Sequence, residues 1–201
     1  MDEFSRRPYA EVTVGDIARG AGVSQGLLAH HFENKHGAYA AVLRETRRNL
    51  GTLPDTRPDL PPGARLRAYW EGHFAYLATH PDLALNLVLP HSGTPEAAAE
   101  FDAARRDGIR DMCLVLALDP DHPAVALALR AFGAGIDRLT ADWLRAGQPF
   151  TVPVLVEAAV QLLAGALRAA PRINPAARVD EAVDRLEVRP PPASAARRSR
   201  R

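Results

Sequence analysis

The residues of this chain that could do chemistry are binding groups, and they gather on one short predicted helix. Leu28 and Phe32, four residues apart, define its buried face. The opposite face carries Gly26, Leu27, Ala29 and His30, and Gln25 and His31 lie at its flanks. Gln and His offer hydrogen bonds to base edges or phosphates, a leucine can contact a thymine methyl group, and small residues allow close approach. The pattern favours a helix lying in a DNA groove, and the alternative is packing against another protein element.

A preceding helix and a tight turn must position this face. Thr13 and Asp16 form a pattern close to a capping box, which starts a helix at Thr13. Gly22 closes that helix where a left-handed residue is usual, and Ser24 begins the next helix as its N-cap. Two helices joined by a short turn that contains glycine are typical of a helix-turn-helix.

A third helix begins after Asn34, which can cap it, and Lys35 lies in its first turn. A cation at this position opposes the helix dipole. A nearby phosphate would remove the conflict, because helix N-termini bind anions. The alternative is a solvated lysine without a partner.

The stretch TVGDIARGAGVSQGLLAHHFENKHGAYAAVL resembles the DNA-binding domain of the tetracycline-repressor (TetR/AcrR) family of bacterial regulators, over roughly residues 4–45. The resemblance rests on Thr13, Asp16-Ile17-Ala18, Ala21-Gly22-Val23-Ser24, His30-His31 before Phe32, and Lys35. It implies that residues 24–32 are the recognition helix and that Thr13 and Lys35 contact phosphates. It also implies an operator-facing set: Ser24 as the N-cap, Gln25, Gly26, Leu27, His30 and His31.

Three departures from the family pattern affect this interpretation. Ala29 stands where the family usually has a tyrosine that touches the DNA backbone, and Gly15 stands where many members have a polar side chain. The family's first helix is usually complete before Phe4, whereas Met1 begins partway through it, so we expect a start codon assigned too late. Without that helix, the apolar faces of Ile17 and Leu28 are expected to be exposed.

Composition favours an all-α protein without membrane spans. The chain of 201 residues is 47% hydrophobic but only 6% aromatic, and it is rich in alanine. Its one cysteine, Cys113, excludes an intrachain disulfide framework and a cysteine metal cluster. Residues 1–50 hold 7 basic and 6 acidic residues, so non-specific DNA affinity from this part should be modest. No signal peptide is recognisable, and we expect a cytoplasmic protein.

The sequence predicts three parts: a helix-turn-helix domain at 1–50, a helical ligand-binding and dimerisation domain at 51–170, and a disordered tail rich in Pro and Arg at 171–201. The proline-rich segment 51–62 separates the first two. Helices are expected at 64–79, from Pro81, at 95–118, at 124–146 and at 151–169.

The last two long predicted helices have small residues that would allow close helix approach: Ala131, Ala134, Gly135, Ala141, Ala158, Ala159 and Ala166. Larger residues add apolar area: Leu139, Trp143, Leu155, Leu162 and Leu163. The alternative is that these residues form the core of one chain. The family resemblance implies a homodimer through a four-helix bundle, and hence a palindromic operator in double-stranded DNA.

An enzyme would need a catalytic set, and we find none. Cys113 lies in an apolar run, and the spacing of His73, His80, Asp82 and His91 matches no metal-ligand pattern, so neither a metal site nor a cofactor is predicted. A small-molecule pocket between helices is more credible. Its candidate lining is Trp70, Phe74, Leu87, His91, Met112, Phe132 and Trp143.

The sequence therefore predicts a homodimeric, ligand-responsive transcriptional regulator, a repressor by preference, whose effector is unknown. One alternative is a truncated paralogue, a helical dimer that no longer binds DNA. Another is a helical small-molecule-binding protein or enzyme that merely contains such a motif.

Overall fold

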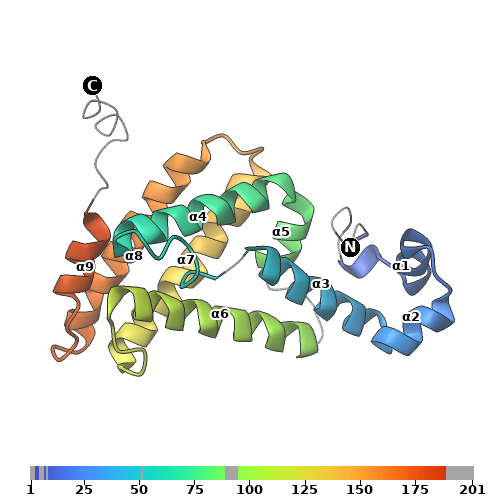
Figure 1. Cartoon of the computed structure of the whole chain (residues 1–201), viewed down its shortest axis with the longest axis horizontal. Coiled ribbons are helices and arrows are strands. Elements are labelled where there is room, and N and C mark those ends of the chain that lie inside the picture. The colour runs from blue at the N-terminus through green and yellow to red at the C-terminus, as the bar shows by residue number, and fades with distance from the viewer. Residues whose placement is uncertain (1–2, 5–6, 8, 51, 89–94, 189–201) are drawn as a thin grey trace.

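The computed structural model describes residues 3–4, 7, 9–50, 52–88 and 95–188, and every regular element within them is helical (Figure 1). The elements are a 3-10 turn η1 (Tyr9–Glu11) and helices α1 (Val14–Ala21), α2 (Gln25–Phe32), α3 (Lys35–Leu50), α4 (Pro62–Thr79), α5 (Pro81–Val88), α6 (Pro95–Leu116), α7 (Pro123–Arg145), α8 (Val152–Ile173) and α9 (Asp180–Glu187). The predicted all-α class is confirmed.

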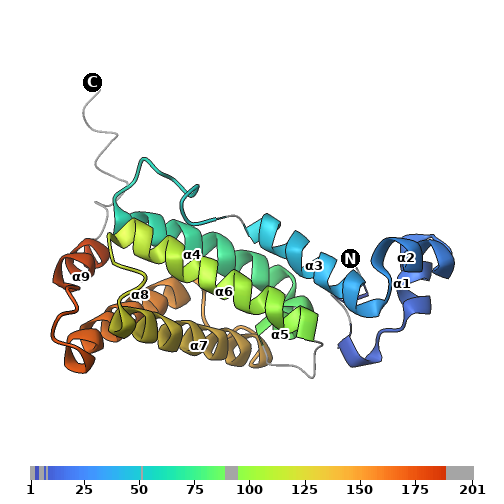
Figure 2. The same ribbon diagram turned by 90° about the horizontal axis from the view of Figure 1, so that it is seen from below.

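The elements form two parts. An N-terminal unit comprises η1 and α1 to α3, and a helical body comprises α4 to α9 (Figure 1). The unit lies at one end of the long axis, and α9 lies at the other. In Figure 2, α4 and α6 form one layer of the body, and α7 and α8 form a second. Helix α3 links the parts, because it starts in the unit and packs along α6.

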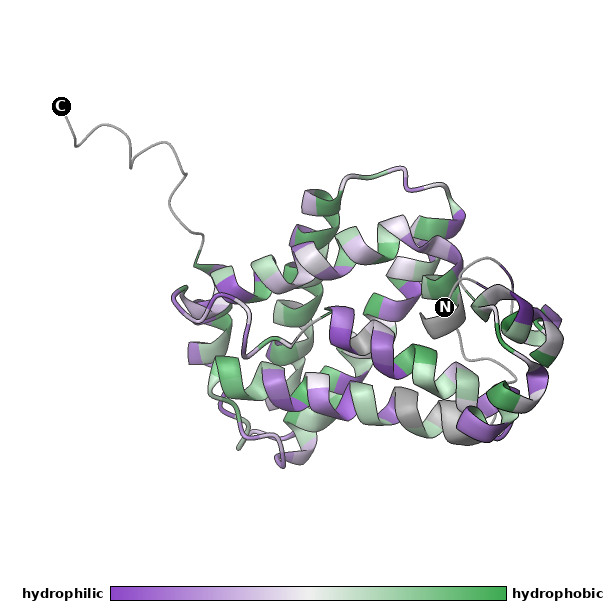
Figure 3. Cartoon of the chain, turned by 45° about the vertical axis from the view of Figure 1, so that its right-hand side comes forward, coloured by the Kyte–Doolittle hydropathy of each residue, from purple (hydrophilic) through white to green (hydrophobic). Residues whose placement is uncertain are grey.

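The core of the body comes from amphipathic helices, along which apolar and polar residues alternate in Figure 3. On α4, Leu66, Trp70, Phe74 and Leu77 recur at three- and four-residue spacing, and each is at most 5% exposed. They pack against α7 and α8, whose mutual contact is the most extensive in the structure. Burial at about 25 cal/mol per Å² of apolar surface makes this core the main source of stability.

The segment before α1 packs without forming a complete helix in the described residues. Its rings join one buried cluster: Phe4, Tyr9, Val12, Tyr39, Val42 and Leu83. The expectation that Ile17 and Leu28 would be exposed is wrong. Leu28 is only 5% exposed, and Ile17 is partly buried against this cluster. Folding back an aromatic-rich segment covers the apolar area that a helix would otherwise cover.

Residues 171–188 fold, so the prediction of a disordered tail from residue 171 is wrong for this stretch. Helix α8 continues through Pro171, which lies in its last turn, to Ile173. Helix α9 buries Ala182, Val183 and Leu186. Its apolar pattern spans only eight residues, too few for the periodicity to stand out among polar neighbours. Residues 189–201, the rest of the predicted tail, lie outside the described residues.

Helix α9 docks against the start of α4 at a glycine. A Cβ atom on Gly63 would lie 2.5 Å from the Leu186 carbonyl oxygen and 2.7 Å from that of Arg185, so no larger residue fits. The Arg67 guanidinium donates hydrogen bonds to the carbonyls of Leu186 (2.9 Å) and Gly63 (3.1 Å). It also pairs with Glu157 on α8 at 2.9 Å. This contact joins α4, α8 and α9.

Candidate DNA interface

Helix α1 begins at a complete capping box, as predicted. The Thr13 hydroxyl accepts a hydrogen bond from the Asp16 N–H (3.1 Å), and the Thr13 N–H donates to the Asp16 carboxylate (3.0 Å). The same carboxylate accepts from the Thr13 hydroxyl at 2.7 Å and pairs with Arg7 and Arg19, each at 3.1 Å. The hydrogen bonds from Thr13, followed by that from Arg7, lower the pKa of Asp16.

The turn between α1 and α2 has the predicted geometry. Gly22 is left-handed with a φ of 67°, and its N–H points to the Ala18 and Arg19 carbonyls. Val23 donates to the Ala18 carbonyl at 3.0 Å. The Ser24 hydroxyl then caps α2 by accepting from the Leu27 N–H at 3.1 Å. These hydrogen bonds fix the direction of α2 relative to α1.

The outer face of α2 is open to solvent. Leu27 is 46% exposed, Leu28 beneath it is 5% exposed, and the remaining face residues are all exposed: Gln25, Gly26, Ala29, His30 and His31. The alternative that another part of the same chain covers this face does not hold among the described residues. Whether these side chains contact DNA stays a prediction.

Phe32 departs from the expectation that it shares a buried face with Leu28, because it is 37% exposed. Helix α2 ends at Phe32, and Glu33 takes a left-handed φ of 61°, which turns the chain into α3 at once. Gly37 makes this turn possible, since a Cβ atom there would lie 2.1 Å from the Phe32 carbonyl oxygen. The Asn34 side chain accepts from the Gly37 N–H at 3.0 Å, which agrees with its predicted capping role.

Gly15, a departure from the family pattern, gives space to the first side chain of α2. A Cβ atom on Gly15 would lie 3.1 Å from the Gln25 amide nitrogen. A larger residue would push Gln25 away from α1. The small residue therefore sets where this candidate base-reading side chain rests.

Lys35 has a partner that the sequence did not reveal. Its ammonium nitrogen lies 4.1 Å from the centroid of the Tyr9 ring, a cation–π contact. Burial lowers the pKa of Lys35. Tyr9 and Lys35 are far apart in the chain, and no local spacing rule links them, so only the tertiary structure could bring out this contact.

The residues predicted to line a ligand pocket divide into three groups. Four rings lie together in the core, with Trp70 against Phe132 (centroids 5.7 Å apart) and Phe74 against Trp143 (6.5 Å). Met112 is partly buried against the same core. The side chain of Leu87 is not described, and His91 lies outside the described residues. The role of this set in binding a ligand stays a prediction.

The N-terminal residues match a family model, and longer stretches of the chain are similar to known regulators. The model of the family "Bacterial regulatory proteins, tetR family" matches residues 1–42. The HTH-type transcriptional regulator BetI of Cronobacter sakazakii is 31% identical over 153 residues, which cover 71% of this chain and 74% of the relative. The BetI protein of Stenotrophomonas maltophilia is 32% identical over 142 residues, covering 68% and 71%.

Solved structures show the same fold. A tetR-family transcriptional regulator from Streptomyces coelicolor has a TM-score of 0.76 at 24% identity, covering 92% of this chain and 83% of that one. The regulator FadR from Bacillus subtilis, solved in complex with stearoyl-CoA, has a TM-score of 0.62 at 21% identity, covering 77% and 88%. With a helix-turn-helix whose outer face is open and with relatives of this similarity, the chain belongs to the tetR family of bacterial regulatory proteins and is a DNA-binding transcriptional regulator.

Proposed function

We propose that this regulator is a ligand-responsive repressor that binds a palindromic operator as a homodimer and reads it with α2. The observation that carries the proposal is the exposed face of α2, which combines small residues with Gln25, His30 and His31 on a helix fixed by its own caps. A surface of this kind is poorly suited to solvation and well suited to close approach to a duplex. The regulator is expected in the cytoplasm, where the DNA is.

The contacts divide between bases and phosphates. Gln25 and His30 are proposed to bond base edges, while Leu27 meets a thymine methyl group. Gly26, as well as Ala29 in place of the family's tyrosine, lets the α2 backbone approach closely. Ser24 and His31 flank this face. Thr13 and Lys35, at the starts of α1 and α3, are proposed to contact phosphates on either side of the groove.

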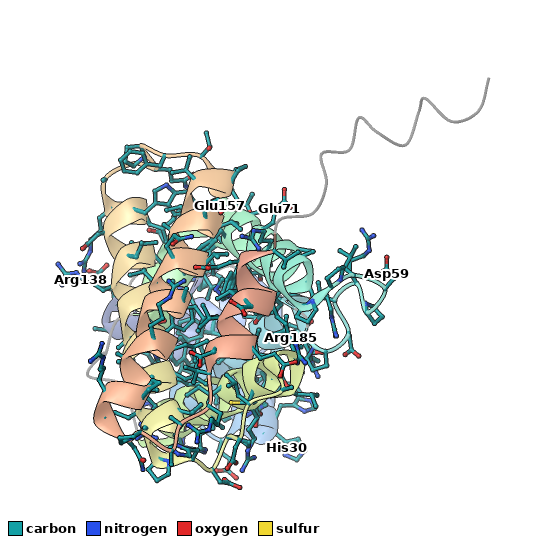
Figure 4. The ribbon with its side chains drawn as sticks, turned by 90° about the vertical axis from the view of Figure 1, so that its left-hand side faces the viewer. His30, Asp59, Glu71, Arg138, Glu157 and Arg185 are labelled. Atoms are coloured by element: carbon teal, nitrogen blue, oxygen red, sulfur yellow. The ribbon has the colours of Figure 1, made fainter. Side chains whose placement is uncertain are left out.

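A second copy of the chain is proposed to cover the outer face of α7 and α8. On α7 this face carries Leu127, Ala131 and Ala134, all exposed. On α8 it carries Val154, Leu162 and Ile173, which are 53%, 43% and 54% exposed and lie on one helical stripe. Arg138 marks the same side of α7, pointing away from the body in Figure 4.

This outer face also explains the composition of α8. By length and apolarity α8 could cross a membrane, but one side of it is core: Leu155, Ala159, Leu163 and Leu167 are buried within the chain. The small residues Ala141 and Ala159 and the large residues Trp143, Leu155 and Leu163, considered for the dimer, are therefore intramolecular core. Ala131, Ala134, Gly135 and Leu162 are exposed and remain available to a partner. A two-fold axis through this face would place two copies of α2 on one operator.

The effector is proposed to bind within the helical body. FadR, which shares this fold, was solved with stearoyl-CoA, and the buried rings around Trp70 and Phe132 give the body an apolar interior. Helix α6 is the element that would transmit effector binding from the body to the N-terminal unit, because it packs on α3 and its Arg105 pairs with Asp137 of α7. The effector must bind the DNA-free conformation more tightly for the operator to be released.

Fluorescence anisotropy with palindromes taken from near its own gene tests the operator proposal. Gln25→Ala and His30→Ala should each weaken binding by roughly 10-fold or more and relax the preference for one base pair in each half-site, since each removes a base contact of about 1–3 kcal/mol from both subunits. Glu71→Ala, an exposed site on α4 far from α2, is the matched control and should bind as the wild type does. An unchanged base-pair preference in both α2 variants would refute base recognition by Gln25 and His30. A folded wild-type dimer without DNA affinity would instead favour a DNA-binding-defective protein.

A further inference from the structure

Tyr9 is held rigidly beside the start of α3. Its side chain is 8% exposed, and its ring lies 4.7 Å from that of Tyr39 and 5.9 Å from that of Phe4, measured between centroids. Its hydroxyl is hydrogen-bonded to Nδ1 of His36, in the first turn of α3. The ring is thus held by two neighbouring aromatic rings and by a hydrogen bond at its hydroxyl.

The Lys35 side chain lies over a face of this ring. The ammonium nitrogen lies 4.1 Å from the ring centroid, well within the range of a cation–π attraction. This attraction offsets an unfavourable interaction, because a cation in the first turn of a helix is opposed by the helix dipole. A free lysine there would move among many rotamers, and ordering them on binding carries an entropic cost.

We propose that Tyr9 is a positioning residue for operator binding, which holds the Lys35 ammonium at the start of α3 so that it meets a phosphate without further ordering. The proposal rests on the proposed DNA contact of Lys35. Tyr9 itself touches no DNA. The hydrogen bond of its hydroxyl to His36 and its packing on Tyr39 fix the Tyr9 ring relative to α3. The ring in turn fixes the position of the Lys35 ammonium.

A double-mutant cycle on the full chain tests this. Operator affinity is measured by anisotropy against KCl concentration for the wild type, Tyr9→Leu, Lys35→Gln and the double variant. Lys35→Gln should reduce the slope of log affinity against log salt by about 1.8, because the proposed homodimer loses one phosphate contact per subunit at about 0.9 each. Tyr9→Leu should weaken binding by about 3-fold when Lys35 is present, the effect of a partly exposed cation–π contact, and by little when Lys35 is already replaced.

Two further variants separate positioning from stability. Tyr9→Phe keeps the ring and should retain most of the affinity that Tyr9→Leu loses. Val12→Ala disturbs the same buried cluster without touching Lys35, so its effect should be equal in both Lys35 backgrounds. NMR of the DNA-free protein gives a direct readout, because the ring should shift the Lys35 ε-methylene protons upfield in the wild type and in Tyr9→Phe.

The positioning role alone would be overturned if the effects of Tyr9→Leu and Lys35→Gln on affinity were additive while the slope of log affinity against log salt was still steeper in the wild type than in Lys35→Gln. Should Tyr9→Leu fail to fold, ε-methylene protons at random-coil positions in the wild type would overturn it equally. A wild type that binds no operator would overturn both this role and the proposed function.

Discussion

Single residues around α1 are already paired within the protein before DNA arrives. The Thr13 hydroxyl proton points to Asp16, and Arg7 and Arg19 pair with the same carboxylate. A phosphate must compete with Asp16 for these groups, so their net contribution to affinity is smaller than their number suggests. Among the described residues, no intramolecular ion pair or side-chain hydrogen bond holds Gln25, His30 or His31, so we expect discrimination between operators to come mainly from α2.

His73 on α4 gives a prediction at this scale. Its Nδ1 is buried and has no hydrogen-bond partner among the described residues, and burial lowers its pKa from 6.5 to about 4. The unfolded chain therefore binds a proton first as the pH falls. Stability that is fully present above pH 6.5 should be lost progressively as the pH falls toward about 4.

Urea denaturation across this range checks the prediction. His73→Leu should flatten the pH dependence of the free energy of unfolding between pH 6.5 and about 4. His30→Ala, which removes an exposed histidine, is the control and should leave that dependence in place. An identical pH dependence in His73→Leu and the wild type would show that burial of this imidazole does not control acid stability.

At the scale of elements, close backbone contacts decide how helices meet. Gly37 lets α3 start directly beneath the Phe32 carbonyl, and Gly63 lets the end of α9 rest on the start of α4. Arg67 donates a hydrogen bond to the Leu186 carbonyl of α9 and pairs with Glu157 of α8, so α9 becomes part of the body. These contacts explain why a helix of eight residues, too short to be stable alone, is folded here.

Gly63→Ala tests the α4–α9 contact. The added methyl group would meet two carbonyl oxygens at under 3 Å, so α9 must shift, at a cost of about 1–3 kcal/mol in the free energy of unfolding. Gly72→Ala, on the same helix with nothing within 4 Å of its Cβ position, is the matched control. It should stabilise by roughly 0.5–1 kcal/mol through helix propensity. Equal responses to the two substitutions in urea denaturation would contradict the proposed close contact.

At the scale of the whole molecule, the proposed homodimer requires the N-terminal unit and the outer face of α7 and α8 to act together. In that dimer each α2 would recognise half of a palindromic operator, so affinity depends on a second copy held at a fixed distance. Helix α3 runs from the unit onto α6, and α6 is tied to α7 by the Arg105–Asp137 pair. Through these contacts, a change in the body can alter the spacing of the two α2 helices.

Leu162→Glu tests the dimer. A buried carboxylate on each side of the two-fold face should weaken self-association by roughly 100-fold or more, because it is desolvated without a partner. Analytical ultracentrifugation should show a monomer, and operator affinity should fall with it. Leu114→Glu, on α6 and 70% exposed, is the control and should remain dimeric. A dimer that survives Leu162→Glu would place the interface elsewhere.

By itself the sequence determined what depends on near neighbours. The capping box at Thr13, the left-handed Gly22, the Ser24 cap and the outward face of α2 follow from residues within one or two turns of each other, and the structure has them as predicted. The all-α class follows from the same short-range periodicity. The family register of these residues indicated a DNA-binding regulator.

Only the tertiary structure decided what depends on distant segments. It showed that the rings of Phe4 and Tyr9 join a buried cluster against which Ile17 packs, that Lys35 lies over Tyr9, and that α9 contacts the start of α4. It also showed which side of α7 and α8 is buried in the core and which is exposed. The sequence could not decide this, because small residues look alike whether they face the core or a partner. Each of these outcomes depends on contacts between segments that are distant in the sequence. Burial is determined by those contacts, and no local sequence pattern specifies them.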